Sequence, residues 1–150
     1  MKVSELSGAL LDYWVARAEG ATGVRVLSDE KGEFAVAEFT LDSSAKVTGA
    51  YYPSTNWLDG GPIIERDQIF LQPPSEVHYN GGPNHGWRRY NHWRATVSAR
   101  TRTLSPKNEV QEAMNVRGVG RGAGDTPLLA AMRAKVASHY GDEVPDEVTK

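Results

Sequence analysis

Apolar residues recur at helical spacing near both ends of the chain, whereas they alternate with polar residues over much of the middle. Near the N-terminus the helical spacing covers residues 7–19, and Gly20 follows as a stop signal. Near the C-terminus, Thr126 is a suitable N-cap, Pro127 suits the first helical position, and Gly141 follows the last apolar residue. The pattern therefore predicts a helix at each end, the second with one apolar face made of Leu128, Leu129, Met132, Val136 and Tyr140.

Alternation of apolar and polar residues predicts strands between these helices. The segments 24–29 and 33–41 flank a turn and are typical of a β-hairpin. Further strands are predicted at 46–52, 63–72 and 93–104. The remaining segments are rich in turn-forming residues, and we expect a loop at 52–62, irregular chain at 75–92, a loop or short helix at 105–114 and a flexible glycine-rich stretch at 117–125.

These elements predict an α+β fold in which a largely antiparallel sheet packs with an N-terminal and a C-terminal helix. The chain has 150 residues, the size of one ordinary domain, and shows neither an internal repeat nor a linker. We therefore expect a single domain over residues 1–150, with an acidic end at about 142–150 that is frayed.

Composition excludes several classes of protein. The absence of cysteine rules out a disulfide framework, a thiolate nucleophile and cysteine-ligated metal centres. No apolar run approaches the ~18 residues of a membrane-spanning helix. Acidic residues stand where a signal peptide would have its apolar core. These features predict a cytoplasmic protein with no membrane partner.

Basic residues are concentrated in one part of the sequence. The whole chain has a formal net charge of -2, yet residues 87–121 contain eight Lys and Arg residues against two Glu, together with Trp87, Tyr90 and Trp93. Arginine pairs two phosphate oxygens at once and stacks on flat rings. Three interpretations remain open: a solvated strand face that pairs with acids elsewhere, an anion or nucleotide site, and a track for nucleic acid.

The segment 52–66, YPSTNWLDGGPIIER, has the composition of a loop with a fixed shape. After Pro53 come short polar side chains that hydrogen-bond to nearby backbone, namely Ser54, Thr55 and Asn56. Trp57 could stack on a flat ligand, and Arg66 could hold a charge. The alternative is that Trp57 packs on the sheet as a plug and that the hydroxyl groups cap backbone groups.

Three blocks of motifs follow one another along the chain: residues 3–16, the strings Tyr52–Trp57 and Gly61–Arg66, and residues 126–145. Together they resemble the phage NinX-like family, small proteins of phages and prophages without an assigned activity. The sequence departs from that family at Asn56, where the family commonly has Asp, and residues 76–122 have no counterpart in it. The resemblance implies a phage accessory protein that acts in the bacterial cytoplasm. It implies no activity, cofactor or catalytic residue.

The sequence has no residue pattern typical of a catalytic or metal site. The histidines at 78, 85 and 92 are more widely spaced than the pairs typical of a zinc site. Ser54 or Thr55 with His92 and Asp59 lacks a nucleophile-elbow pattern. The pair Glu65 and Asp67 suits any solvated strand face. We therefore expect no catalytic residue, no metal and no cofactor.

The glycine-rich run that begins at Gly118 fits a dinucleotide-binding motif only in its spacing, because it does not open a βαβ unit. Its glycines lead to a helix start at Thr126, where free backbone N–H groups favour an anion. Arg117 and Arg121 flank that start. The alternative is a mobile surface loop.

The leading functional hypothesis is a binding protein that sequesters a small phosphorylated ligand, such as a nucleotide defence signal, without turnover. We expect a homo-oligomer, because closed pockets often lie between subunits. The candidate ligand-binding residues are Tyr52, Ser54, Thr55, Asn56, Trp57, Arg66, Trp87, Arg88, Arg89 and Arg121. One alternative is a single-stranded nucleic-acid-binding protein of phage replication or recombination, with a basic sheet face of Arg94, Arg100 and Arg102. Another is an inhibitor of a host protein.

Overall fold

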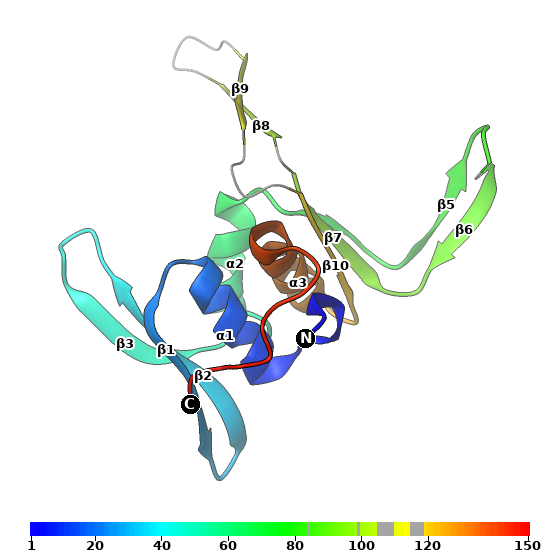
Figure 1. The fold of residues 1–150 in the computed structure, drawn as a ribbon. Coiled ribbons are helices and arrows are strands. Elements are labelled where there is room, and N and C mark those ends of the chain that lie inside the picture. The colour runs from blue at the N-terminus through cyan, green and yellow to red at the C-terminus, as the bar shows by residue number, and fades with distance from the viewer. Residues whose placement is uncertain (84, 99, 105–109, 115–118) are drawn as a thin grey trace.

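The computed structural model describes residues 1–83, 85–98, 100–104, 110–114 and 119–150 (Figure 1). Among these residues, the chain forms two three-stranded antiparallel sheets, and each sheet packs on one of two central helices. The helices also pack on each other, so the core lies between the two sheets. This arrangement confirms the predicted α+β class, with antiparallel strands and a helix near each terminus.

The first sheet confirms the predicted hairpin and third strand. Its strands are β1 (Thr22–Asp29), β2 (Gly32–Thr40) and β3 (Lys46–Tyr51), in that order. A short 3-10 turn, η1 (Val3–Glu5), precedes α1 (Gly8–Ala18), which contacts β1 and β2. Burial alternates along the first part of β1, where Val24 and Val26 are buried on either side of the exposed Arg25. This alternation is expected for a strand with one face on the core.

The predicted loop is confirmed at residues 52–56 and the predicted strand at residues 70–72, but the predictions for residues 57–69 were wrong. Residues Trp57–Arg66 form a helix, α2, and β4 covers only Phe70–Gln72. The Asn56 side chain caps α2, because its Oδ1 accepts a hydrogen bond from Leu58 N. At Gly60, a Cβ would lie 2.3 Å from the Pro53 carbonyl oxygen. Glycine therefore serves close packing inside a helix here, whereas the sequence suggested a turn.

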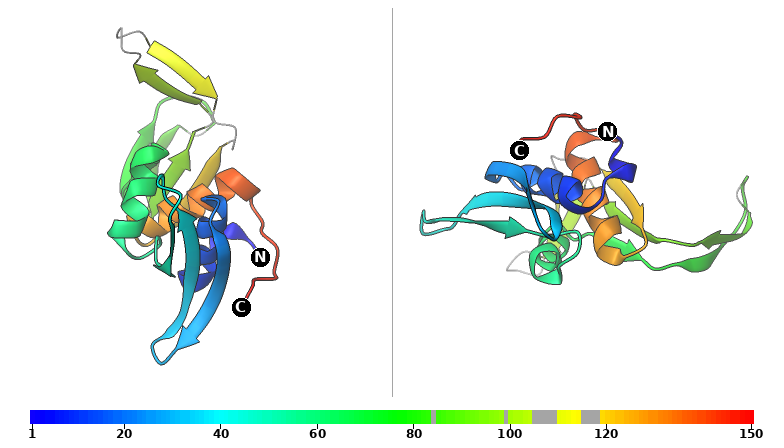
Figure 2. Two further views of the ribbon diagram at one scale, coloured as in Figure 1. Left: turned by 90° about the vertical axis from the view of Figure 1, so that its left-hand side faces the viewer. Right: turned by 90° about the horizontal axis from the view of Figure 1, so that it is seen from below.

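Two hairpins project from the body of the molecule, and the sequence predicted neither. The first, here called the β5–β6 arm, consists of β5 (Ser75–Tyr79) and β6 (Gly86–Tyr90), within the segment predicted to be irregular. Its turn contains Gly81 and Gly82, both at positive φ. Figures 1 and 2 show this arm extending far from the central helices.

The second hairpin replaces part of the predicted strand at 93–104. That segment divides into β7 (Trp93–Val97) and β8 (Arg100–Leu104). The strand β8 pairs with β9 (Val110–Met114), so the predicted loop or short helix is a strand over these residues, while residues 105–109 lie outside the described ones. The same alternation suits both halves of the segment, so it could not reveal that they pair with different strands.

The glycine-rich stretch forms an edge strand, β10 (Gly120–Gly124), in the second sheet, whose order is β10-β7-β4. Residues 117 and 118 lie outside the described part. A Cβ at Gly120, Gly122 or Gly124 would come within 2.0–2.7 Å of atoms of the C-terminal helix. These glycines allow the strand to lie directly on that helix, so the prediction of a flexible stretch was wrong for residues 120–124.

The C-terminal helix α3 (Pro127–Tyr140) confirms the predicted start and end. The Thr126 hydroxyl accepts a hydrogen bond from Leu129 N, and Gly141 ends the helix at a φ of 86°. The predicted single apolar face is too narrow. Burial extends around the helix to Ala130, Ala131, Ala134 and Ala137, because α3 lies between α1 and the second sheet.

The acidic end of the chain, which the sequence predicted to fray, has partners in the structure. Val144 is buried, and its N–H donates to the carbonyl oxygen of Met1 at 2.9 Å. Farther along, the carbonyl oxygen of Thr149 accepts a hydrogen bond from Val26 N at 2.9 Å. The two terminal segments therefore lie side by side on the body.

Candidate functional site

The structure places the predicted site residues at separate positions. Tyr52, Ser54, Thr55, Asn56 and Trp57 precede or begin α2, and Arg66 ends it. Trp87, Arg88 and Arg89 lie on β6 of the projecting arm, and Arg121 lies on β10. The residues that we predicted to form one site are therefore distributed over three regions of the fold.

Backbone N–H groups before α2 are paired within the protein, whereas the buried Ser54 hydroxyl has no hydrogen-bond partner among the described residues. The N–H of Ser54 donates to Asp12 Oδ1 at 2.8 Å, and the N–H of Tyr52 donates to Asp59 Oδ2 at 2.9 Å. Burial raises the pKa of Asp12 to about 6, although the hydrogen bond from the Ser54 N–H acts in the opposite direction. These contacts fix the entry into α2. The side chain of Trp57 remains exposed to 55% and does not plug the loop.

Arg66 belongs to a network of charges that joins α1, α2 and α3. Its Nη1 and Nη2 each donate to the Glu19 carboxylate at 2.7 Å, and its Nε donates to Asp67 at 3.0 Å. The fully buried ammonium group of Lys135 pairs with the same two carboxylates. Burial disfavours the charge of Glu19, but hydrogen bonds from Arg66 and Lys135 hold its pKa below the ordinary value. The Arg66 guanidinium is thus already paired with carboxylates of the protein, although its side chain is 55% exposed.

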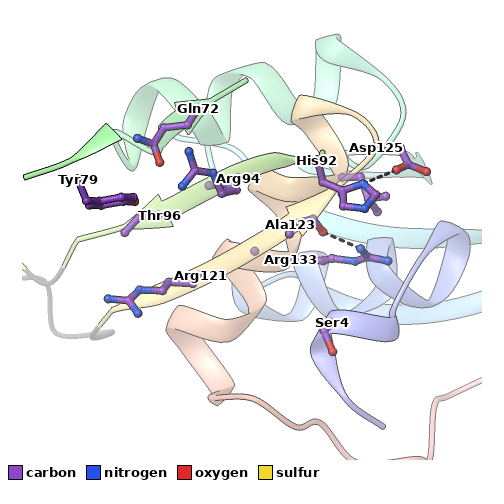
Figure 3. Close-up of a pocket in the computed structure, with 14 residues that line it drawn as sticks. Ser4, Gln72, Tyr79, His92, Arg94, Thr96, Arg121, Ala123, Asp125 and Arg133 are labelled. Carbon is purple, nitrogen blue, oxygen red and sulfur yellow. Dashed lines mark hydrogen bonds and ion pairs between the residues drawn. The ribbon is translucent and has the colours of Figure 1, made fainter. Parts of the chain in front are cut away.

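A groove with a volume of about 840 Å³ lies at the second sheet (Figure 3). Since the glycines of β10 face α3, its alternate residues Arg121 and Ala123 point to the opposite, outer face. Pairing with β7 places Thr96 beside Arg121 and Arg94 beside Ala123 on that face. We call this region the outer-face groove; its lining also includes Gln72, Tyr79, His92, Asp125 and Arg133.

Arg94 is the most unusual residue of the groove. Its guanidinium carbon lies 3.4 Å from the centre of the Tyr90 ring, so the two groups are stacked. Its Nε and Nη2 atoms are buried and have no hydrogen-bond partner among the described residues. A buried donor without a partner costs about 1–3 kcal/mol, and more when it is charged. An acceptor that draws this guanidinium off the ring would remove that cost.

Two more arginines add positive charge to the groove. Arg121 is exposed, and within the described part of the chain its side chain has neither a hydrogen-bond nor an ion-pair partner. Arg133 donates from Nε to the Leu6 carbonyl at 2.9 Å and from Nη1 to the Ala123 carbonyl at 2.7 Å. Asp125, a carboxylate in the lining, lies 2.8 Å from His92 Nδ1. Among the described residues, the lining therefore contains three arginines against one carboxylate.

Of the ten predicted residues, Arg121 alone is among those that line this groove. Sequence reasoning missed Tyr79 and Arg133, and it included Arg94 in the basic stretch 87–121 but not among the ten candidate ligand-binding residues. One signal was available, because glycine at every second position of residues 120–124 is the period of a strand with one closely packed face. Had this period been used, it would have placed Arg121 on the open face.

The fold and the groove together define a small α+β protein with an arginine-lined surface groove. The family model described as "Bacteriophage P22, NinX" matches residues 2–139, a range that includes residues 76–122, for which the motifs had indicated no counterpart. The chain therefore belongs to the phage NinX family, as its motifs indicated. No curated protein matches the chain. Within the described residues, none of the helices has the length and apolar character needed to cross a membrane.

Proposed function

We propose that this phage-family protein binds a small phosphorylated ligand in the outer-face groove and holds it without turnover. The observation that supports this proposal best is the state of Arg94 and Arg121. Within the described residues, the first has two buried donors without a partner, and the second has an unpaired guanidinium group. Both belong to the lining of one groove, so an anion that enters it would satisfy them together.

The size and lining of the groove suit a nucleotide-like molecule. Small-molecule sites typically enclose about 300–1,000 Å³, and this groove has about 840 Å³. Arginines would pair with phosphate oxygens, and the Tyr79 ring offers a flat surface for a base. In the cytoplasm of a bacterial host, binding without turnover would sequester a nucleotide defence signal. A homo-oligomer would close the open groove over such a ligand.

Calorimetric titration with inorganic phosphate, AMP and GMP tests this proposal. Arg121→Gln should lower the affinity for the nucleotides about ten- to a hundredfold, since a hydrogen bond to a charged group contributes about 1.5–3 kcal/mol. Arg25→Gln is the matched control, because Arg25 is an exposed arginine on the first sheet. Equal affinities for wild type and Arg121→Gln, or no binding of any probe, would refute the proposal.

A protein partner is a second candidate function, supported by a separate observation. Trp57 and Leu58, at the first turn of α2, are exposed to 55% and 80%, and Tyr52 beside them is exposed to 38%. Exposed apolar groups of this kind are typical of protein contacts. Trp57→Ala should leave nucleotide binding unchanged if the outer-face groove is the ligand site, whereas a loss of about 1–3 kcal/mol would return Trp57 to that site.

A further inference from the structure

The β5–β6 arm has two faces of different chemistry. Cross-strand pairs place Glu76 opposite Arg89 and His78 opposite Trp87 on one face, here called the far face. The ring centres of His78 and Trp87 are 5.0 Å apart, and Arg89 Nη2 lies 2.6 Å from Glu76 Oε1. The other face, here called the groove face, carries Ser75, Val77, Tyr79, Gly86, Arg88 and Tyr90.

Contacts on the groove face form a continuous series of arginine and tyrosine side chains. The Arg88 guanidinium lies 5.9 Å from the centre of the Tyr79 ring. The hydroxyl groups of Tyr79 and Tyr90 are 2.8 Å apart, and Arg94 stacks on Tyr90 at 3.4 Å. Since Tyr79 and Arg94 both line the outer-face groove, the series leads from the arm into it. Arg121 continues it on the neighbouring strand.

Charge is separated between the two faces of the arm. Its strands contain one carboxylate, Glu76, which lies on the far face and is paired with Arg89. The groove face therefore combines Arg88 with two tyrosine rings and lacks an acidic residue over these strands. Positive charge interleaved with exposed aromatic rings is the usual surface for single-stranded nucleic acid.

We propose that the groove face of the arm and the outer-face groove form one track for a single-stranded oligonucleotide. This inference rests on the proposed function and extends it from a single phosphorylated unit to a chain of them. Arginines contact successive phosphates, and tyrosine rings stack on bases. Each strand of the arm has five residues, about 17 Å at ~3.3 Å per residue, which is longer than one nucleotide.

Fluorescence anisotropy with oligothymidylates of about two, four and eight nucleotides tests the track, with thymidine monophosphate as a competitor. The wild-type affinity should rise with length and fall with salt. Arg88→Gln should weaken binding of the longest probe about tenfold and lower the salt slope by about 1, while the monophosphate still binds. Trp87→Ala is the matched control on the far face, and it should bind every probe as the wild type does.

Each outcome separates this inference from the proposed function. An oligonucleotide that binds no more tightly than the monophosphate overturns the track and leaves the small-ligand site in place. A loss in Trp87→Ala as large as that in Arg88→Gln overturns the assignment to the groove face. Equal binding of a duplex overturns the single-strand class. If neither the monophosphate nor any oligonucleotide binds, the proposed function fails as well.

Discussion

Replacement of Gly122 by alanine tests the packing that creates the outer face. Gly122 pairs with Ala95 in the second sheet and faces the backbone of α3. An added Cβ would lie 2.2 Å from the Ala130 carbonyl oxygen and 2.5 Å from Ala134 N. Non-bonded carbon contacts are about 3.5–4.0 Å long, so the strand would have to move by about 1 Å. Neither obstacle is a side chain that could rotate away.

The expected cost follows from these contacts. Overpacking of a well-filled core costs about 1–3 kcal/mol, and backbone obstacles put Gly122→Ala at the upper end, about 3 kcal/mol. At about 2–4 °C per kcal/mol for a chain of this size, the melting temperature should fall by about 9 °C. Urea unfolding followed by tryptophan fluorescence measures the free energy of unfolding, and the m-value should stay unchanged.

Gly49→Ala provides a matched control in the first sheet. A Cβ at Gly49 meets nothing within 4 Å, and Gly49 lies in the exposed strand β3. Alanine at such a site changes stability little or raises it by about 0.4–1 kcal/mol through the unfolded chain. Gly122→Ala should therefore lower the free energy of unfolding, whereas Gly49→Ala should leave it nearly unchanged or raise it. Equal free energies of unfolding for the two variants would show that β10 does not lie on the α3 backbone.

Three further changes follow from single contacts. Lys135→Met removes the buried cation shared by Glu19 and Asp67 and leaves Arg66 to pair with both, so it should cost about 3 kcal/mol in urea unfolding, the lower end for a broken buried pair. Because burial raises the pKa of Asp12 from 3.8 to about 6, the folded state keeps a proton that the unfolded chain releases. The stability contributed by this proton should fall by up to about 3 kcal/mol between about pH 4 and pH 7, and Asp12→Asn should remove that part of the pH dependence. Asn56→Ala should lower the melting temperature through the loss of about 1 kcal/mol of capping, whereas Asn56→Asp should preserve it.

The elements predicted correctly are those whose sequence signals lie within the element or directly beside it. The start of α3 follows from Thr126 and Pro127, and its end from Gly141, all of which act on the adjacent backbone. The β1–β2 hairpin follows from alternation around a short turn. The family resemblance likewise rests on contiguous strings, and the match over residues 2–139 confirms it.

Errors arose where a residue serves a distant contact. Gly60 resembles a turn residue in the sequence, but its missing side chain makes room for Pro53 and Leu128. Pro62 suggests a break, yet the chain around it is helical over Trp57–Arg66. The β5–β6 arm is a different case, because its Asn80-Gly81 pair is a strong local hairpin signal that was missed among the surrounding turn formers. Composition alone does not distinguish a glycine needed for packing, or a proline within a helix, from a residue of a turn.

The candidate site shows the same distinction in its arginines. Arg66 and Arg121 were both candidate ligand-binding residues in the sequence. Folding brings Arg66 to Glu19, 47 residues away, whereas Arg121 has no carboxylate partner among the described residues. What separates them is the direction of each side chain, and at β10 that direction is set by the glycines that face α3. If the outer-face groove binds an anion as proposed, β10 couples the stability of the fold to that binding. A strand displaced by about 1 Å in Gly122→Ala also displaces Arg121, so this variant should lose affinity even at temperatures where it is fully folded.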